Sequence, residues 1–179
     1  DDAQRQGCVD VAVITPDELA SPLPRAYQWC DGSAYLAHME RIRAARGMSL
    51  PPGHDTEPIV YQSGSDAFLG PTEPVPLPDP DWGLDLEATV AVVTGDVPRG
   101  TRAADVPAHI RLVLLADDLT YRGLMPLEYA KSVGPYLAKP ARPYAPFART
   151  VESLGELWDG RLLHATVRTT VRGEEIGAL

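Results

Sequence analysis

The sequence predicts an α+β fold that is mostly β, with few and short helices. Three stretches alternate or stay apolar as strands do, at residues 86–93, 110–116 and 163–171. The 18 prolines and 15 glycines fit turns and extended segments and do not suit a helix bundle. With 179 residues, the chain has the length of one domain with one core.

The N-terminal part of the chain is expected to contain one helix. Residues 9–14 alternate weakly and are consistent with a short strand. Asp31 or Ser33 can then cap a helix that runs to about Arg46, because apolar side chains recur at helical spacing and Gly47 supplies a stop.

A long proline-rich loop precedes the strand around which the chain is organised. Residues 58–62 are predicted to be a strand, and residues 64–83 form a loop far longer than the usual connection. Long loops in compact domains are often functional or wrap a site. The strand within residues 83–96 follows; its side chains alternate, so Glu87 and Thr89 share one face and an all-apolar set occupies the other.

The next segments alternate between short helices and a buried strand. Residues 105–109 begin a helical turn, and residues 110–116 are typical of a buried strand. Asp117 and Asp118 follow this strand directly. Residues 126–132 are predicted to form a helix with proline at its first turn.

The C-terminal region is predicted to be a hairpin after a short helical segment at residues 151–157. Side chains at positions 163, 165, 167, 169 and 171 alternate and indicate a long strand with one buried face. Residues 172–175 then form the turn of the hairpin, and the returning strand follows.

Composition excludes several classes of protein. The 16 basic and 25 acidic side chains give a net charge of −9 without a basic cluster, so a nucleic-acid partner is not expected. Cys8 and Cys30 have no metal-type spacing and favour a reducing compartment, so we expect a cytoplasmic protein. No apolar run has transmembrane length, and the N-terminus lacks the pattern of a signal peptide.

Acidic side chains at two strand ends indicate half of a site for a hard cation. Glu87 and Thr89 open one face of their strand, and Asp118 could meet them from the next strand. Carboxylate oxygens are the ligands that Mg²⁺, Ca²⁺ and Mn²⁺ prefer. The alternative interpretation is that these residues are acids on the protein surface, which strand ends commonly carry.

His38, Lys139 and Arg122 are the other candidates for chemistry. A histidine such as His38 can act as a general base, and nearby Glu40 can orient it only at a helix end or a bend. Lys139 and Arg122 could hold an anionic substrate or an enolate. Each has a plainer alternative, because helix histidines are often packed or exposed and loop cations are usually solvated.

The order of these segments resembles the fumarylacetoacetate hydrolase family over nearly the whole chain from about Ser21. The family's lid helix, which carries the catalytic histidine, is similar to AYLAHME, and the segment before its metal strand is similar to EPIVYQSGSDAFLGP. Its Glu-x-Glu strand resembles LDLEATVAVVTGDVPRG, and its strand ending in an aspartate ligand resembles LLADDLTYRG. Its lysine loop is similar to PYLAKPARPYAPFAR, and its late turn resembles VRTTVRGEEIG.

The resemblance implies a mixed β-sheet or β-roll with few helices, formed by residues 21–179 as a partial catalytic domain after an N-terminal remnant at 1–20, with C-terminal strands missing. It also implies a homodimer or a complementing partner chain. The implied roles are then as follows: His38, Glu40 and Lys139 as catalytic residues, Tyr61, Ser63, Arg122 and Lys139 as substrate contacts, and Glu87 and Asp118 as ligands of Mg²⁺ or Mn²⁺.

The implied reaction is hydrolysis or decarboxylation at a carbon–carbon bond of a small 1,3-dicarbonyl or 2-oxo acid, with a polyketide-like substrate as a further option. A divalent ion would stabilise the enolate left behind. Three positions depart from the family pattern: Thr89 replaces a glutamate ligand, Gly123 replaces an aspartate, and Arg41 replaces the partner of the histidine.

These departures leave three alternatives. The chain acts as a metal-dependent enzyme, or it has been repurposed for metal-independent acid/base chemistry or ligand binding in biosynthesis, or it is a subunit that needs a longer partner. A neutral hydroxyl at Thr89 is a weak ligand, so the affinity for a cation is expected to fall.

Overall fold

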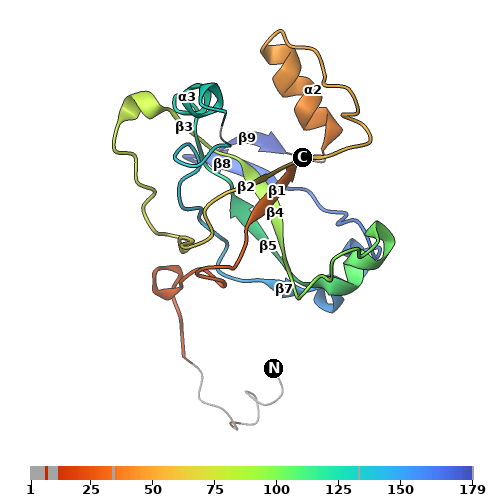
Figure 1. The fold of residues 1–179 in the computed structure, drawn as a ribbon. Coiled ribbons are helices and arrows are strands. Elements are labelled where there is room, and N and C mark those ends of the chain that lie inside the picture. Colours follow the sequence, from red (N-terminus) through yellow and green to blue (C-terminus); the bar gives the residue numbers. More distant parts are fainter. Residues whose placement is uncertain (1–6, 8–11, 34, 133, 179) are drawn as a thin grey trace.

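The computed structural model describes residue 7 and residues 12–33, 35–132 and 134–178 (Figure 1). Within them strands outnumber helices, as predicted for a mixed α+β fold, and the strands form four small antiparallel sheets. The regular helices are short, α2 at Leu36–Ala45 and α3 at Met125–Ala130. Neither is long and apolar enough to span a membrane, and no other helix of the described residues is either.

The largest sheet has the order β4-β5-β7 and lies at the centre of the molecule. Its strands are β4 (Ala88–Thr94), β5 (Ile110–Asp117) and β7 (Arg149–Thr150). The two predicted strands are therefore confirmed, and they pair with Thr89 opposite Ala116 and Ala91 opposite Leu114. Paired residues share a face of an antiparallel sheet, so these positions point the same way.

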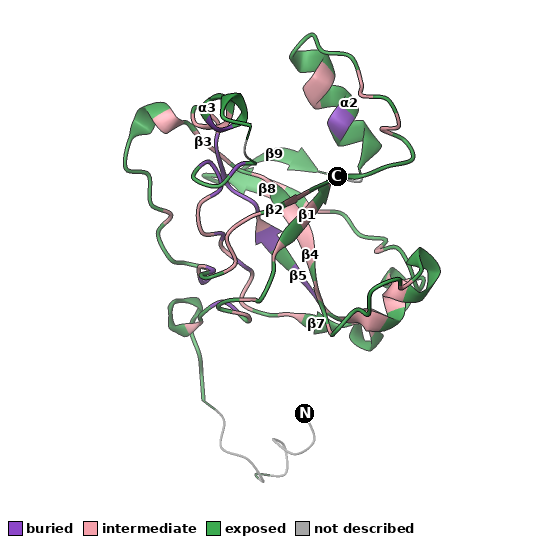
Figure 2. Ribbon diagram, in the orientation of Figure 1, coloured by how far each residue is buried: buried purple, intermediate pink, exposed green. Residues whose placement is uncertain are grey.

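The core lies on the face of β4 that carries Thr89. Its buried members are Phe68, Leu114, Ala116 and Tyr144, and partly buried side chains of β4 and other segments pack against them. The opposite face of the sheet is partly open, since Leu115 and Val92 are 50% and 48% exposed, whereas Val113 on the same face is 4% exposed. Buried residues concentrate along β5 and around α3 (Figure 2). Glu87, two positions before Thr89, therefore starts on the core side.

Strands β1 (Cys30–Ser33) and β2 (Ile59–Gln62) form a separate pair in front of the central sheet. The strand predicted at 58–62 is confirmed. The predicted helix caps are wrong: Asp31 and Ser33 are strand residues, and the helix α2 begins after Tyr35 without a side-chain cap. Pairing with β2 fixes these residues in extended geometry and outweighs their capping preference.

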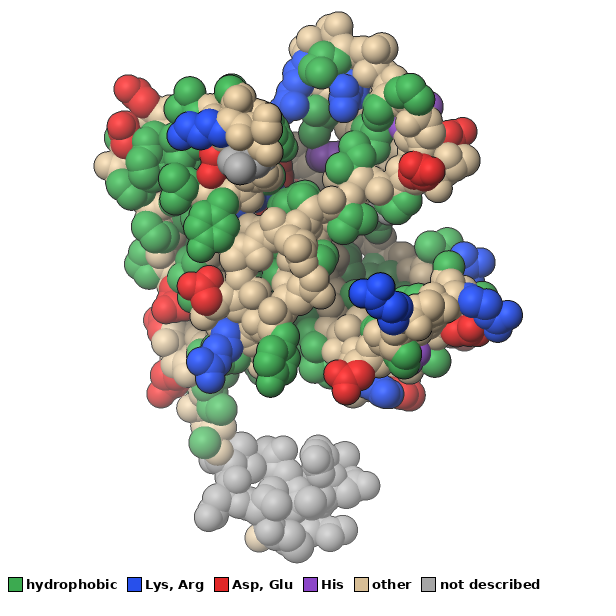
Figure 3. All heavy atoms as spheres, viewed as in Figure 1, with side chains coloured by type: hydrophobic (Ala, Val, Ile, Leu, Met, Phe, Trp, Pro, Cys, Tyr) green, Lys and Arg blue, Asp and Glu red, His purple; other side chains and the backbone are tan. Residues whose placement is uncertain are grey.

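Helix α2 stands away from the sheets (Figure 1). Met39 is its one buried residue, and the rest of the helix is exposed or half-buried. In the space-filling view, the lobe that carries α2 is separated from the remainder of this face by a hollow (Figure 3). Lys and Arg side chains are interspersed with acidic ones on the same face and form no continuous basic surface.

The segment after β5 folds back over the end of the central sheet. Strand β6 (Thr120–Tyr121) pairs with β3 (Leu84–Asp85), and helix α3 follows. The carboxylate of Glu128 on α3 accepts hydrogen bonds from the backbone N–H groups of residues 136, 137 and 138, at 2.9, 2.7 and 3.0 Å. These bonds fix the loop that leads into Lys139.

Four 3₁₀ segments complete the regular structure: η1 (Pro16–Glu18), η2 (Pro80–Trp82), η3 (Ala103–His109) and η4 (Glu152–Leu157). The last two confirm the predicted helical turns at 105–109 and 151–157. Half of the strand expected at 9–14, residues 9–11, lies outside the described residues, and the described half, residues 12–14, is not a strand.

The predicted C-terminal hairpin is confirmed, with β8 at Arg168–Val171 and β9 at Glu174–Ala178. Its turn places Arg172 and Gly173 at φ 52° and 86°, as a tight two-residue turn requires. The long strand and its buried face are wrong, because residues 164–167 are irregular and Ala165 and Val171 are exposed. The hairpin pairs with no other described strand.

Candidate active site

The sheet brings Glu87 and Asp118 together at one end of the core. The backbone N–H of Asp118 donates to the carbonyl of Glu87 at 3.0 Å, and the N–H of Glu87 donates to the Asp117 carboxylate at 2.6 Å. These two bonds fasten the end of β5 to the residue that precedes β4. The two carboxylates that the sequence singled out are therefore neighbours.

Lys139 bridges these carboxylates. Its ammonium donates to Glu87 Oε2 at 2.6 Å, to Asp118 Oδ2 at 2.7 Å and to the Asp118 carbonyl at 2.9 Å. A lysine ammonium has three N–H donors, so all of them are engaged. The residue is only 6% exposed. Lys139 thus lies in the candidate site, where its charge is paired with two carboxylates.

Arg122 and Tyr61 extend the cluster on either side. Arg122 Nε donates to Asp85 at 2.7 Å, and its Nη2 donates to Glu87 Oε1. The hydroxyl of Tyr61 donates to Asp118 Oδ2. Burial raises the pKa of Tyr61, and the negative charge of Asp118 raises it further, so the phenol stays protonated and remains a donor.

Arg142 is a member of the cluster that sequence reasoning missed. It is 1% exposed, and its Nε donates to Asp118 Oδ1 at 2.6 Å while Nη1 donates to the carbonyl of Gly64 at 3.0 Å. Its guanidinium lies 3.6 Å from the centre of the Trp29 ring, a cation–π contact. The signal that could have found it is its position three residues after Lys139 in a segment already singled out.

Positive and negative charges balance within the cluster. Three carboxylates face three cations; the acids are Asp85, Glu87 and Asp118, and the cations are Arg122, Lys139 and Arg142. Two further acids lie at its border. Burial is the main cause that raises the pKa of Asp117 and of Asp31, and the charge of Asp118 raises both further.

The remaining predicted site residues lie in different settings. His38 and Glu40 are exposed on α2, and neither makes a side-chain hydrogen bond or ion pair to the charged cluster within the described residues. Thr89 is half-buried on the core face of β4, opposite Ala116. The hydroxyl of Ser63 is buried without a hydrogen-bond partner in the part of the chain that the structure describes.

Gly123 has a steric reason to be glycine. A Cβ at this position would lie 2.7 Å from the carbonyl oxygen of Asp81 and 3.2 Å from that of Trp82. The N–H of Gly123 donates to the same Trp82 carbonyl at 2.8 Å, which holds the backbones together. An aspartate, the residue of the family pattern, would therefore displace the turn that contains η2.

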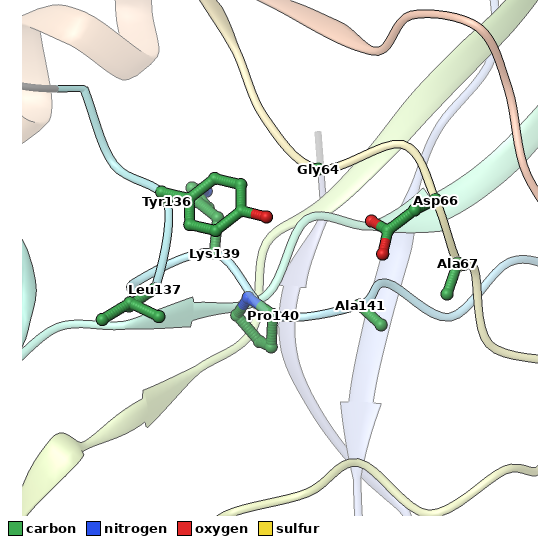
Figure 4. A pocket seen from close by; sticks show the side chains of 8 residues that line it. All are labelled: Gly64, Asp66, Ala67, Tyr136, Leu137, Lys139, Pro140 and Ala141. Carbon is green, nitrogen blue, oxygen red and sulfur yellow. The ribbon is translucent and has the colours of Figure 1, made fainter.

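A pocket of about 230 Å³ opens beside Lys139 (Figure 4). Tyr136 lies on one side and Asp66 on the other, and Pro140 and Ala141 lie between them. Gly64, whose carbonyl binds Arg142, also lines the pocket. The pocket is thus adjacent to the charged cluster and is a place where a small molecule could reach it.

Comparison with known proteins identifies the relatives of this arrangement. The family model described as fumarylacetoacetate (FAA) hydrolase C-terminal matches residues 28–178. The chain belongs to the fumarylacetoacetate hydrolase family. The match includes every predicted site residue of this family member, from α2 to the Lys139 loop.

Two human proteins of the family are similar to part of this chain. They are the mitochondrial oxaloacetate tautomerases FAHD2B and FAHD2A, each 28% identical over 93 residues. That stretch is 52% of this fumarylacetoacetate hydrolase family chain and 27% of either human protein. The chain therefore matches about a quarter of the length of these curated relatives.

Solved structures of the family share the fold. A candidate HpcE protein from Mycobacterium smegmatis has a TM-score of 0.69 and 22% identity, covering 99% of this chain and 61% of its own. The 5-carboxymethyl-2-hydroxymuconate delta-isomerase from the same species has a TM-score of 0.60 and 19% identity, covering 90% of this chain and 57% of its own. The chain spans about three fifths of these structures.

Members of the fumarylacetoacetate hydrolase family typically use a divalent metal ion, and the residues present here do not fit one. All four carboxylate oxygens of Glu87 and Asp118 accept bonds from Lys139, Arg122 or Arg142. A divalent cation would lie against these positive charges. Thr89 supplies only a neutral hydroxyl. Within the described ranges, no three His, Cys, Asp or Glu side chains are grouped to hold a metal.

Proposed function

We propose that this member of the fumarylacetoacetate hydrolase family is an enzyme that converts a small 2-oxo or 1,3-dicarbonyl acid through an enolate. The pocket beside Lys139 is the proposed substrate site, and C–C hydrolysis, decarboxylation and keto–enol tautomerisation all pass through such an enolate. One observation carries the proposal: a buried, charge-balanced cluster of Lys139, Arg142, Glu87 and Asp118 lies behind an accessible pocket.

The physical reason is the charge that develops on the substrate. Removing a proton next to a carbonyl, or breaking the adjoining carbon–carbon bond, moves negative charge onto the carbonyl oxygen. Fixed positive groups in a site shielded from water stabilise that charge strongly. Lys139 and Arg142 are such groups, since they are 6% and 1% exposed. The names of the relatives, a tautomerase and an isomerase, agree with enolate chemistry.

His38 is the proposed base, by its match to the lid helix of the family. It is exposed on α2, and a hollow separates the lobe that carries α2 from the remainder of this face (Figure 3). A base must come within hydrogen-bond reach of the proton that it removes. The proposal therefore requires α2 to approach the pocket when substrate is bound.

The test is exchange of substrate protons with solvent. The protein is incubated in D₂O with oxaloacetate, pyruvate and an acylpyruvate, and loss of the C3 proton signals is followed by NMR. The expected result is exchange well above the uncatalysed rate with at least one acid, lowered about 100-fold or more in Lys139→Met. Lys131→Met, an exposed lysine of α3's C-terminal end, is the matched control.

A second candidate function is binding without turnover. It is favoured by the fact that Lys139 has all three N–H donors engaged with protein acceptors. Saturable binding of an oxo acid by calorimetry, without proton exchange or product, would select this function. If the protein neither binds any of the three acids nor exchanges their protons, both candidate functions are excluded.

A further inference from the structure

We propose that Arg142 takes the place of the divalent cation in this chain, so that the site holds the oxyanion of its ligand without a metal. The inference deepens the proposed function and rests on it for the class of ligand, a small carboxylate or enolate. It concerns one residue, its partners and one free donor.

Protein groups fill the position that the cation would take. Arg142 and Lys139 bond the two oxygens of Asp118, at 2.6 Å and 2.7 Å, and Lys139 also bonds Glu87 at 2.6 Å. A metal could bind these carboxylates only after both cations had left them. Each cation would then be buried without a carboxylate to balance its charge, which is strongly unfavourable.

Arg142 is held in place from several sides. Trp29 stacks on the guanidinium at 3.6 Å, Asp118 accepts from Nε, and the carbonyl of Gly64 accepts from Nη1 at 3.0 Å. Trp29 is itself fixed, because its indole N–H donates to the Tyr144 hydroxyl at 2.8 Å. The positive charge of Arg142 is therefore held at a fixed position in the folded protein, as the charge of a bound metal ion would be.

Arg142 still has an N–H donor that no described residue accepts from. Its Nη2 is buried and has no hydrogen-bond partner in the described residues, and the same is true of the Ser63 hydroxyl. Buried polar groups are nearly always paired, so these two indicate a partner that comes from outside the protein. An oxygen of a carboxylate or enolate satisfies both kinds of donor.

Arg142 lies close to the pocket beside Lys139. Gly64, which binds Arg142, and Ala141, its neighbour in the chain, both line the pocket beside Lys139 (Figure 4). Arg142 thus lies directly behind the pocket wall. The proposal therefore requires Gly64 or Ala141 to shift when a ligand in the pocket reaches Nη2.

The experiment measures metal and oxyanion binding separately from turnover. Protein treated with EDTA is titrated with Mn²⁺ and followed by the EPR signal of the free ion, and oxalate is then titrated by calorimetry with EDTA present. We expect no stoichiometric Mn²⁺ binding at concentrations up to about 1 mM, which is on the order of the dissociation constants of the weaker carboxylate sites. We expect saturable oxalate binding, weakened about 100-fold in Arg142→Lys.

Arg142→Lys keeps the charge and removes the planar fork, so it is gentler on folding than Arg142→Met. Arg149→Lys, on the exposed strand β7, is the control and should bind oxalate like the unaltered protein. Three results would each overturn the inference. The first is that the unaltered protein binds one equivalent of Mn²⁺ and Glu87→Gln does not. The others are that oxalate binding requires Mn²⁺, or that Arg142→Lys binds oxalate with unchanged affinity. Failure of proton exchange alone would instead count against the proposed function.

Discussion

At the scale of single residues, Asp118 is the centre of the site. It accepts hydrogen bonds from Tyr61, Lys139 and Arg142 and is almost fully buried. Such an arrangement is stabilising only while each charge has its partner, since an unpaired buried charge costs several kcal/mol. Asp118 therefore stabilises the fold at the end of the central sheet and also holds Lys139 in place beside the pocket.

We predict that Asp118→Asn lowers the free energy of unfolding by about 3–5 kcal/mol. The substitution removes the negative charge that Lys139 and Arg142 share. Urea denaturation followed by circular dichroism measures the effect. The control is Asp105→Asn, which removes an exposed pair with Arg102 and should leave the midpoint nearly unchanged. Equal midpoints for the two variants would contradict this account.

The sequence predicted part of this site. Glu87 and Asp118 were expected together because alternation and strand ends place side chains reliably, and the structure brings them together with Lys139 and Arg122. Arg142 was not predicted, because no periodicity gives the direction of a side chain in a proline-rich loop. The catalytic roles of His38 and Glu40 stay predictions.

At the scale of elements, strand β5 shows how alternation positions the site. Leu114 is 5% exposed and packs in the core, whereas its neighbour Leu115 is 50% exposed on the open face. Six of the seven residues 110–116 are apolar, so the sequence predicted the strand but not which face is covered. Only the packing of Phe68 and Tyr144 decides that.

These neighbours give a matched pair of substitutions. Leu114→Ala is expected to lower the free energy of unfolding by about 2–5 kcal/mol, because it leaves a cavity between Phe68 and Tyr144. Leu115→Ala should cost less than about 1 kcal/mol, since half of the side chain is already in water. Chemical denaturation compares the two, and a larger cost for Leu115→Ala would show that another surface covers the open face.

Helix α3 acts on the site through Glu128. Burial tends to raise the pKa of this carboxyl, but the three backbone N–H donors of residues 136–138 outweigh it and hold the pKa below its ordinary value of 4.5. A lowered pKa stabilises the fold above the ordinary value, and this contribution is lost as the pH falls through the folded pKa. Glu128 therefore secures the Lys139 loop at neutral pH.

We predict that Glu128→Gln lowers the free energy of unfolding at pH 7 by about 2 kcal/mol, because charged acceptors are replaced by a weaker amide. The difference from the unaltered protein should shrink as the pH falls from 4.5 through the lowered pKa of the folded protein, where Glu128 itself takes up a proton. Denaturation curves across this pH range measure it. Glu156→Gln, exposed on η4, is the control, and a difference that grows in acid would refute the assignment.

At the scale of the whole molecule, the strands form separate small sheets, and the one core cluster lies on the central sheet. The hairpin β8–β9 pairs with no other described strand, and every residue of β9 is exposed. The turn residues predicted this hairpin correctly. The prediction of a buried face was wrong, because alternating apolar side chains show that one face of a strand could be covered, not that another segment covers it. Membership of the family, in contrast, follows from the order of the segments.

Hydrogen exchange should reveal this unevenness. Amides of β9 are expected to exchange at least about 100-fold faster than those of β5, which has partners on both sides and a buried face. Mass spectrometry of peptic peptides from the intact chain measures both strands in one sample. Equal protection would mean that the hairpin is covered in solution, and a dependence on protein concentration would identify the cover as a second copy.

The stacking of Arg142 on Trp29 has an optical consequence. Indole emission depends on the electric field across the ring, and here a guanidinium lies 3.6 Å from its centre. Any event that draws Arg142 toward a ligand alters that field. With Trp82→Phe and Trp158→Phe as background substitutions, the fluorescence of Trp29 would report directly on the state of the charged cluster, without label or substrate turnover.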